Sequence, residues 1–295
     1  MKSNPFCLAV GYRANIARLI GVPNVSFHNY EGMHFFFLNT LMRGLEKRSS
    51  KKFIRVIAQW IASKHLRLVR DKIAKEAEKQ CVSGQCAASL PLLQKAIYLG
   101  HLPSRALVAH MLMNGREGVA CDCNAMFELV DEGARLGCGH CQGVMAWCYK
   151  WGYGIRRDYV RALELARESS GKGSKYGQNV LGCFYWQDSE VVAKDYAQAL
   201  SLLGLAAAQN FDMAQYSLGC MYDFGHGVAQ DHAEALRLYQ LAVAQGHPIA
   251  MRMVANCYEL GRGVLKNKAE AIRWYRRAQA ASCPEASYDV WRLTR

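Results

Sequence analysis

The chain has 295 residues, of which 51% are hydrophobic and 21% charged, so it can bury a sizeable core in one large domain or two smaller ones. This composition excludes a wholly disordered protein, and apolar runs such as residues 33–38 are far shorter than the ~20 residues of a membrane-spanning helix. The formal net charge of +13 is uneven, because residues 1–80 hold 15 basic and 5 acidic residues. A basic N-terminal part therefore precedes a nearly neutral body.

The first thirty residues contain Lys2, Arg13 and Arg18 but no acidic residue. An amphipathic, acid-free N-terminus is typical of organelle transit peptides, so a mitochondrial or other organelle location is the alternative to the cytoplasmic location that we predict. The apolar core of a secretory signal is missing, since Arg13 and Arg18 interrupt residues 6–20.

The densest basic stretch is residues 43–79, within an N-terminal helical extension or cap predicted for residues 1–65. Its central cluster consists of Lys47, Arg48, Lys51, Lys52 and Arg55. Such a cluster attracts phosphate or acidic surfaces, so binding of RNA or an acidic surface is one functional hypothesis. A solvated helix face is the simpler interpretation, because no RNA-binding motif accompanies the charge.

Five consecutive windows of 36 or 37 residues then repeat one pattern. They are residues 102–137, 138–173, 174–210, 211–246 and 247–282. Each contains a helix-period segment, a turn and a second helix-period segment. The turn is Gly-x-Gly followed by Val or Ile in three windows, whereas the third window has Gln187-Asp188-Ser189-Glu190-Val191 and one extra residue.

Each recurring position has a physical reason, which the fourth window illustrates. Gly219 is small where two helices of a hairpin approach, and Tyr222 can fill the seam between neighbouring hairpins. Gly225 and Gly227 permit the positive φ that a tight turn needs, and Asp231 suits the N-cap of the second helix. The other predicted caps are Asp122, Asp158, Asp195 and Asn267.

The pattern A…LG…Y..G.GV..D…A…A..G resembles that of the Sel-one-like (Sel1-like) repeat family, which is related to tetratricopeptide repeats. The resemblance implies an all-α fold, an α-solenoid of stacked helical hairpins in a right-handed superhelix. It also implies an adaptor that assembles protein complexes. We extend the solenoid to residues 66–295, with a degenerate repeat at 66–101 and a C-terminal cap at 283–295, because the ends of a solenoid need capping.

In tetratricopeptide-like geometry the first helix of each hairpin lines a concave groove. Alignment on the small residue of that helix predicts eight partner-binding residues: Trp147, Lys150, Asn179, Trp186, Tyr216, Asp223, Arg252 and Glu259. Aromatic rings mixed with charges of both signs are typical of binding hot spots. The alternative is that the large side chains only fill gaps between repeats.

Cysteine and histidine positions bear on metal binding. Cys121, Cys123, Cys138 and Cys141 have a zinc-like spacing, but a helix predicted over residues 124–136 would be roughly 20 Å long and would separate the two pairs. We therefore predict no metal site. Four recurring thiols are expected to be reduced and buried, namely Cys148, Cys183, Cys220 and Cys257. Three histidines at predicted helix ends or turns are expected to be exposed, namely His140, His226 and His247.

These observations predict a non-enzymatic, monomeric adaptor that holds a protein or peptide in the concave groove and uses no cofactor. No catalytic triad or phosphate-binding loop is present. RNA or acidic-surface binding through residues 43–79 is the alternative. A cysteine-rich repeat hydrolase is a lesser one, because such relatives carry two cysteines in each repeat and the last three windows carry one each.

Overall fold

A computed structural model describes residues 51–295 except 84 and 115–121. These described residues form thirteen α-helices and no named strand, and the sole β-type pairing is an isolated bridge between Ser189 and Val192. The all-α prediction is therefore confirmed. The chain is divided into two compact units, residues 1–69 and residues 70–295.

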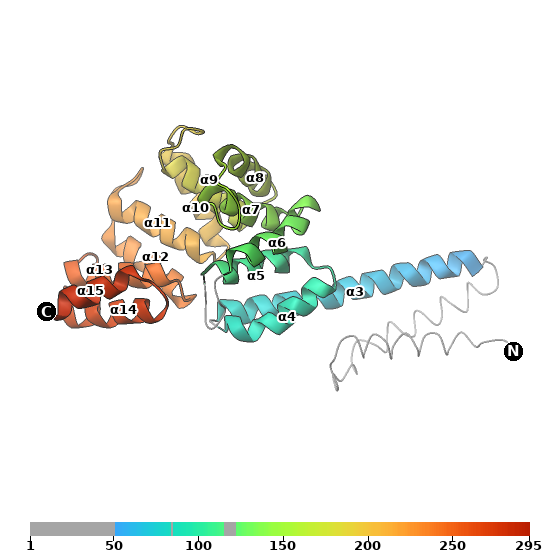
Figure 1. Cartoon of the computed structure of the whole chain (residues 1–295), viewed down its shortest axis with the longest axis horizontal. Coiled ribbons are helices and arrows are strands. Elements are labelled where there is room, and N and C mark those ends of the chain that lie inside the picture. The colour runs from blue at the N-terminus through green and yellow to red at the C-terminus, as the bar shows by residue number, and fades with distance from the viewer. Residues whose placement is uncertain (1–50, 84, 115–121) are drawn as a thin grey trace. The chain divides into compact units, whose positions relative to one another are not determined.

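The helices alternate with short connections throughout the described part of the chain (Figure 1). In chain order they are α3 (Lys51–Val82), α4 (Cys86–Tyr98), α5 (Leu102–Asn114), α6 (Cys123–Arg135), α7 (Gly139–Trp151), α8 (Tyr159–Gly171), α9 (Lys175–Trp186), α10 (Tyr196–Ala208), α11 (Asp212–Phe224), α12 (His232–Ala244), α13 (Pro248–Leu260), α14 (Lys268–Ala280) and α15 (Glu285–Thr294). Each predicted window therefore holds one helical hairpin, from α5/α6 to α13/α14. The predicted boundary between residues 65 and 66 lies inside α3.

The turns and caps of the hairpins follow from single residues, as predicted. Gly225 and Gly227 have φ values of 70° and 73°, which a residue with a Cβ adopts only with strain. Asp231 caps α12 by accepting hydrogen bonds from the backbone N–H groups of Ala233 and Glu234. The same capping role belongs to Asp122, Asp158, Asp195 and Asn267.

In two hairpins the helices approach closely at the predicted small residue. A Cβ added to Gly219 would come 2.7 Å from the ring of Tyr239, and one added to Gly182 would come 2.8 Å from Leu203. Tyr239 and Leu203 are themselves fully buried. In α9/α10 and α11/α12, therefore, a large side chain of the second helix packs on the bare backbone of the first.

The hairpins of residues 102–282 stack in chain order along an arc (Figure 1). The first helices α5, α7, α9 and α11 touch one another in succession, whereas second helices such as α8 and α10 make at most slight contact with each other. The array therefore curves with its first helices on the inside, which confirms the α-solenoid prediction. Beyond the last hairpin, α15 packs on α14 around the buried side chains of Tyr275, Cys283 and Ala286.

The inside of the curve is closed between α5 and α11. His110 Nε2 lies 3.6 Å from Asp212 Oδ1, and both side chains are buried. The His110 ring also packs on Phe211, with centroids 5.2 Å apart, and on Tyr176 at 5.8 Å. Side chains of the first and fourth windows, separated by about one hundred residues, thus meet at the centre of the superhelix.

Candidate functional site

The eight predicted groove residues lie on four consecutive first helices, two on each. Trp147 and Lys150 are on α7, Asn179 and Trp186 on α9, Tyr216 and Asp223 on α11, and Arg252 and Glu259 on α13. Their surroundings differ between the two ends of the row.

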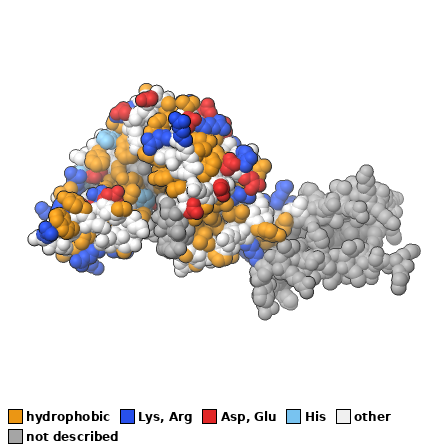
Figure 2. Space-filling view, viewed as in Figure 1, with side chains coloured by type: hydrophobic (Ala, Val, Ile, Leu, Met, Phe, Trp, Pro, Cys, Tyr) orange, Lys and Arg blue, Asp and Glu red, His pale blue; other side chains and the backbone are white. Residues whose placement is uncertain are grey.

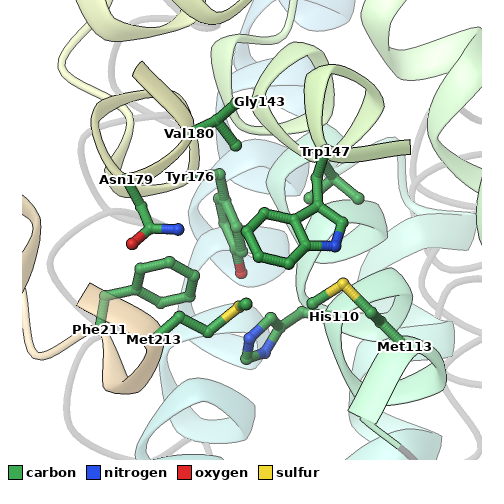
Figure 3. Close-up of a pocket in the computed structure, with 10 residues that line it drawn as sticks. His110, Met113, Gly143, Trp147, Tyr176, Asn179, Val180, Phe211 and Met213 are labelled. Atoms are coloured by element: carbon green, nitrogen blue, oxygen red, sulfur yellow. The ribbon is translucent and has the colours of Figure 1, made fainter. Parts of the chain in front are cut away.

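Trp147 and Asn179 lie at the closed centre. They line a cavity with room for only about 10 Å³, together with His110, Tyr176, Phe211, Met113 and Met213 (Figure 3). Asn179 is buried and Trp147 half-buried. Trp147 Nε1 and Asn179 Oδ1 have no hydrogen-bond partner among the described residues. This volume holds about one water molecule, so the centre of the array does not admit a peptide as it stands.

Lys150 is buried, although a lysine was expected at an open groove. Its Nζ lies 4.1 Å from the centroid of the Phe184 ring and 5.3 Å from that of Trp151, and it makes no hydrogen bond with any described residue. Burial lowers the pKa of Lys150, while the nearby Cys183 opposes the shift. The two rings offset part of the cost of burying an ammonium group.

Lys150→Met is expected to stabilise the protein at pH 7 by about 1–2 kcal/mol, because it removes a buried charge that only aromatic rings balance. The lowered pKa means that the unfolded chain binds this proton more tightly. The wild-type penalty is therefore full below the folded-state pKa and is relieved as the pH rises towards about 10.4. Urea unfolding of both proteins at several pH values measures the difference, which should shrink with rising pH. A variant less stable than wild type at pH 7 would contradict this account.

Trp186 lies in a cluster of rings around His226, at the turn between α11 and α12. Its Nε1 donates to His226 Nδ1 at 2.9 Å, and the His226 ring stacks on Tyr196 and on the exposed Phe224. The prediction that His226 is exposed is therefore wrong, since the ring is enclosed by three aromatic side chains.

The other two histidines expected at the surface are also engaged. His140 is half-buried and its Nδ1 lies 2.8 Å from Ser174 Oγ. His247 is 5% exposed, caps α13 through the Ala250 N–H and stacks on Tyr216. Ser174 and Tyr216 come from the neighbouring hairpin, which the local sequence does not reveal.

The charged residues at the C-terminal end of the row form ion pairs with other side chains of this protein. Asp223 is buried and pairs with His232 at 2.7 Å and with Arg262 at 3.8 Å. Arg252 pairs with Asp289 of α15 at 2.6 Å.

Glu259 makes two bonds to Arg292 of α15, at 2.7 and 2.8 Å. The hydrogen bond from Arg292 lowers the pKa of Glu259, and burial acts in the opposite direction. Arg252 and Glu259 therefore attach the terminal helix to α13.

A larger cavity of about 450 Å³ lies beside Lys150, where the third window departs from the repeat pattern. Its walls are Lys150 and Trp151 of α7, Tyr159 of α8, Phe184 of α9 and the α9–α10 loop. The loop residues that line it are Gln187, Asp188, Ser189, Glu190, Val192, Ala193 and Lys194. Sequence reasoning did not identify this cavity. The signal for it was the extra residue in this loop. In the structure, Ser189 and Val192 pair across the loop and close it into a tight turn.

On the face that Figure 2 shows, acidic and basic side chains are interspersed over the repeats. Of the predicted basic cluster, Lys47 and Arg48 lie outside the described residues. Lys51, Lys52 and Arg55 lie in the first turns of α3. Within the described ranges, no group of three or more His, Cys, Asp or Glu side chains could hold a metal ion, and no helix could span a membrane.

The described cysteines are all free thiols. Cys148, Cys183, Cys220 and Cys257 are buried, which confirms the prediction for these four positions. The helix predicted between the two cysteine pairs is α6, which separates Cys123 from Cys138.

Comparison with known proteins identifies the repeats. The family model described as "Sel1 repeat" matches residues 139–174, 175–211, 212–247 and 248–280, each one residue after the start of a predicted window. Windows 66–101 and 102–137 fall outside these matches. No curated protein sequence matches the chain significantly.

Solved structures that are similar to the chain include the following two. A Sel1 repeat protein from Oxalobacter formigenes is 22% identical, with 72% of this chain and 86% of that chain covered and a TM-score of 0.48. A protective antigen of uropathogenic Escherichia coli strains, which displays an SLR fold, is 21% identical, with 75% of this chain covered and a TM-score of 0.45. The alignment spans half the length of that antigen.

Proposed function

Because residues 139–280 of this chain are Sel1 repeats, we propose that the protein is a non-enzymatic scaffold that holds a protein or peptide on its helical array. Sel1-repeat proteins are generally protein-interaction scaffolds, and a solenoid offers an extended surface for this purpose. The partner is proposed to contact the row of first-helix residues from Trp147 to Glu259. Because the centre around Trp147 and Asn179 is closed, the strongest contacts are proposed to lie at the larger cavity beside Lys150.

The observation that carries this proposal is the 450 Å³ cavity beside α7 and α9. Its size is within the range of ligand pockets, and it could receive one or two side chains of a peptide. Aromatic rings of Tyr159 and Phe184 form the apolar part, with centroids 6.4 Å apart. Lys194 and Asp188, joined at 2.7 Å, supply charges of both signs. A buried apolar anchor with a polar rim is typical of an interaction hot spot.

Tyr159→Ala is expected to weaken partner binding at least about tenfold, because truncation of a hot-spot ring costs ~2 kcal/mol or more and a tenfold change corresponds to ~1.4 kcal/mol. Tyr98→Ala is the matched control, since Tyr98 is more exposed (73% against 37%) and does not line the cavity. Partners captured from a cell extract by the full-length chain would be purified and their affinity for each variant measured. Circular dichroism checks that both variants keep their helices.

Equal affinity of the two variants would contradict the assignment of the cavity. Binding that collapses as salt rises, and that neither variant changes, would instead favour the basic segment 43–79 and an acidic ligand such as RNA.

A further inference from the structure

The N-terminus of α7 carries two cysteines that the scaffold function does not use. Cys138 is the N-cap residue and Cys141 lies in the first turn, so the two thiols are neighbours at the start of the helix. Cys138 is partly exposed, whereas Cys141 is fully buried. One helical turn places such a pair roughly 5–6 Å apart at Cα, the separation that a disulfide bridges.

The surroundings of Cys138 favour a thiolate. The neighbouring Cys141 thiol is the main cause that lowers the pKa of Cys138, to about 6, and the Lys172 ammonium adds to the effect. Lys172 is fixed in place, since its Nζ donates to Gly137 O at 3.0 Å and to Gln142 Oε1 at 2.7 Å. The positive end of the α7 dipole acts in the same direction. The pKa of Cys141 is raised by the neighbouring Cys138 and by burial.

The backbone of α6 makes room for the buried thiol. A Cβ at Gly133 would come 2.5 Å from Cys141 Sγ, so only glycine leaves this space. Cys141 Sγ also lies 3.4 Å from Leu102 O, to which it donates a hydrogen bond. Cys141 is thus a buried, neutral thiol next to the partly exposed thiolate of Cys138.

We propose that Cys138 and Cys141 form a redox-active dithiol that exchanges with disulfides, of which glutathione disulfide is the simplest. The Cys138 thiolate attacks one sulfur of the disulfide, a mixed disulfide forms, and the first thiolate leaves. Cys141 then loses its proton to this leaving thiolate, attacks Cys138 Sγ and releases the second leaving group as a thiolate. The disulfide is reduced by two electrons to one thiol and one thiolate, and the cysteine pair is oxidised to an intramolecular disulfide.

Three other buried thiols lack these features. Burial raises the pKa of Cys148 and of Cys257 to about 12, and raises that of Cys183 as well. A thiol that stays protonated is a poor nucleophile, so exchange should be confined to the start of α7.

The test uses the reduced full-length chain, treated with glutathione disulfide at neutral pH, quenched with acid and mapped by mass spectrometry. The wild type should contain a Cys138–Cys141 disulfide. Cys141→Ala, which lacks the second thiol, should retain one glutathione on Cys138, and Cys138→Ser should form neither product. Cys148→Ala, on the same helix, should behave as the wild type.

A second readout is the rate of Cys138 alkylation against pH. Its midpoint should lie near 6, compared with about 8.5 for an unperturbed thiol. Glutathione spread evenly over several cysteines, no adduct at all, or an alkylation midpoint near 8.5 would each overturn the proposal. If Cys141→Ala fails to fold, the wild-type map and the alkylation midpoint still decide the question.

Discussion

Gly177→Ala is expected to lower the free energy of unfolding by about 3 kcal/mol, because the new methyl group has no space. Gly177 lies in the first turn of α9, and a Cβ there would come within 2.7 Å of the Ser170 nitrogen and closer still to Ser169. Ser169 is fully buried and donates to Gly139 O at 2.6 Å, so it cannot move aside. Across the same contact, a Cβ at Gly143 would come 2.5 Å from the Gly177 nitrogen.

Gly204→Ala is the matched control. Gly204 lies within α10, and a Cβ there would meet nothing within 4 Å. The alanine should therefore stabilise the helix by roughly 0.5–1 kcal/mol. Thermal and urea unfolding, followed by circular dichroism, compare the two variants. If both substitutions changed stability in the same direction, the close approach of α7, α8 and α9 would not be the cause.

Tyr239→Ala should cost about 4 kcal/mol, within the range for deletion of a large buried ring. Tyr239 is fully buried and its ring lies against the bare backbone of Gly219, so the cavity left behind cannot close by a simple side-chain shift. Its hydroxyl group makes a long contact of 3.5 Å to Cys220 Sγ, which is a weak acceptor.

Tyr239→Phe separates the ring from the hydroxyl group. Only the weak bond to sulfur is lost, so the expected change is less than about 1 kcal/mol. The same unfolding measurements apply. An alanine variant as mild as the phenylalanine variant would mean that the α11/α12 hairpin relaxes around the missing ring.

Features that depend on residues close in the sequence could be predicted. Asp231 caps the helix that begins at the next residue, and Gly225 adopts a left-handed conformation within its own turn. Gly219 meets Tyr239 twenty residues later, inside one hairpin, and the repeat pattern already placed a small residue there.

Features that depend on the stacking of hairpins could not be predicted. His226 is enclosed by Trp186 and Tyr196, which belong to the preceding window. Lys150 was expected to line an open groove, but it is buried against Phe184 of the next hairpin. The contact between His110 and Asp212 depends on small rotations that accumulate over four hairpins.

The contact between His110 and Asp212 has a mechanical consequence. In a solenoid whose units touch only their neighbours, a change of pitch spreads evenly along the array. Here His110 of α5 contacts Asp212 of α11. The distance between the first and the fourth hairpin therefore cannot increase unless this buried pair separates. The hairpin α13/α14 and helix α15 lie beyond that junction. We expect elastic opening of the array, under load or on docking of a large partner, to begin after α12.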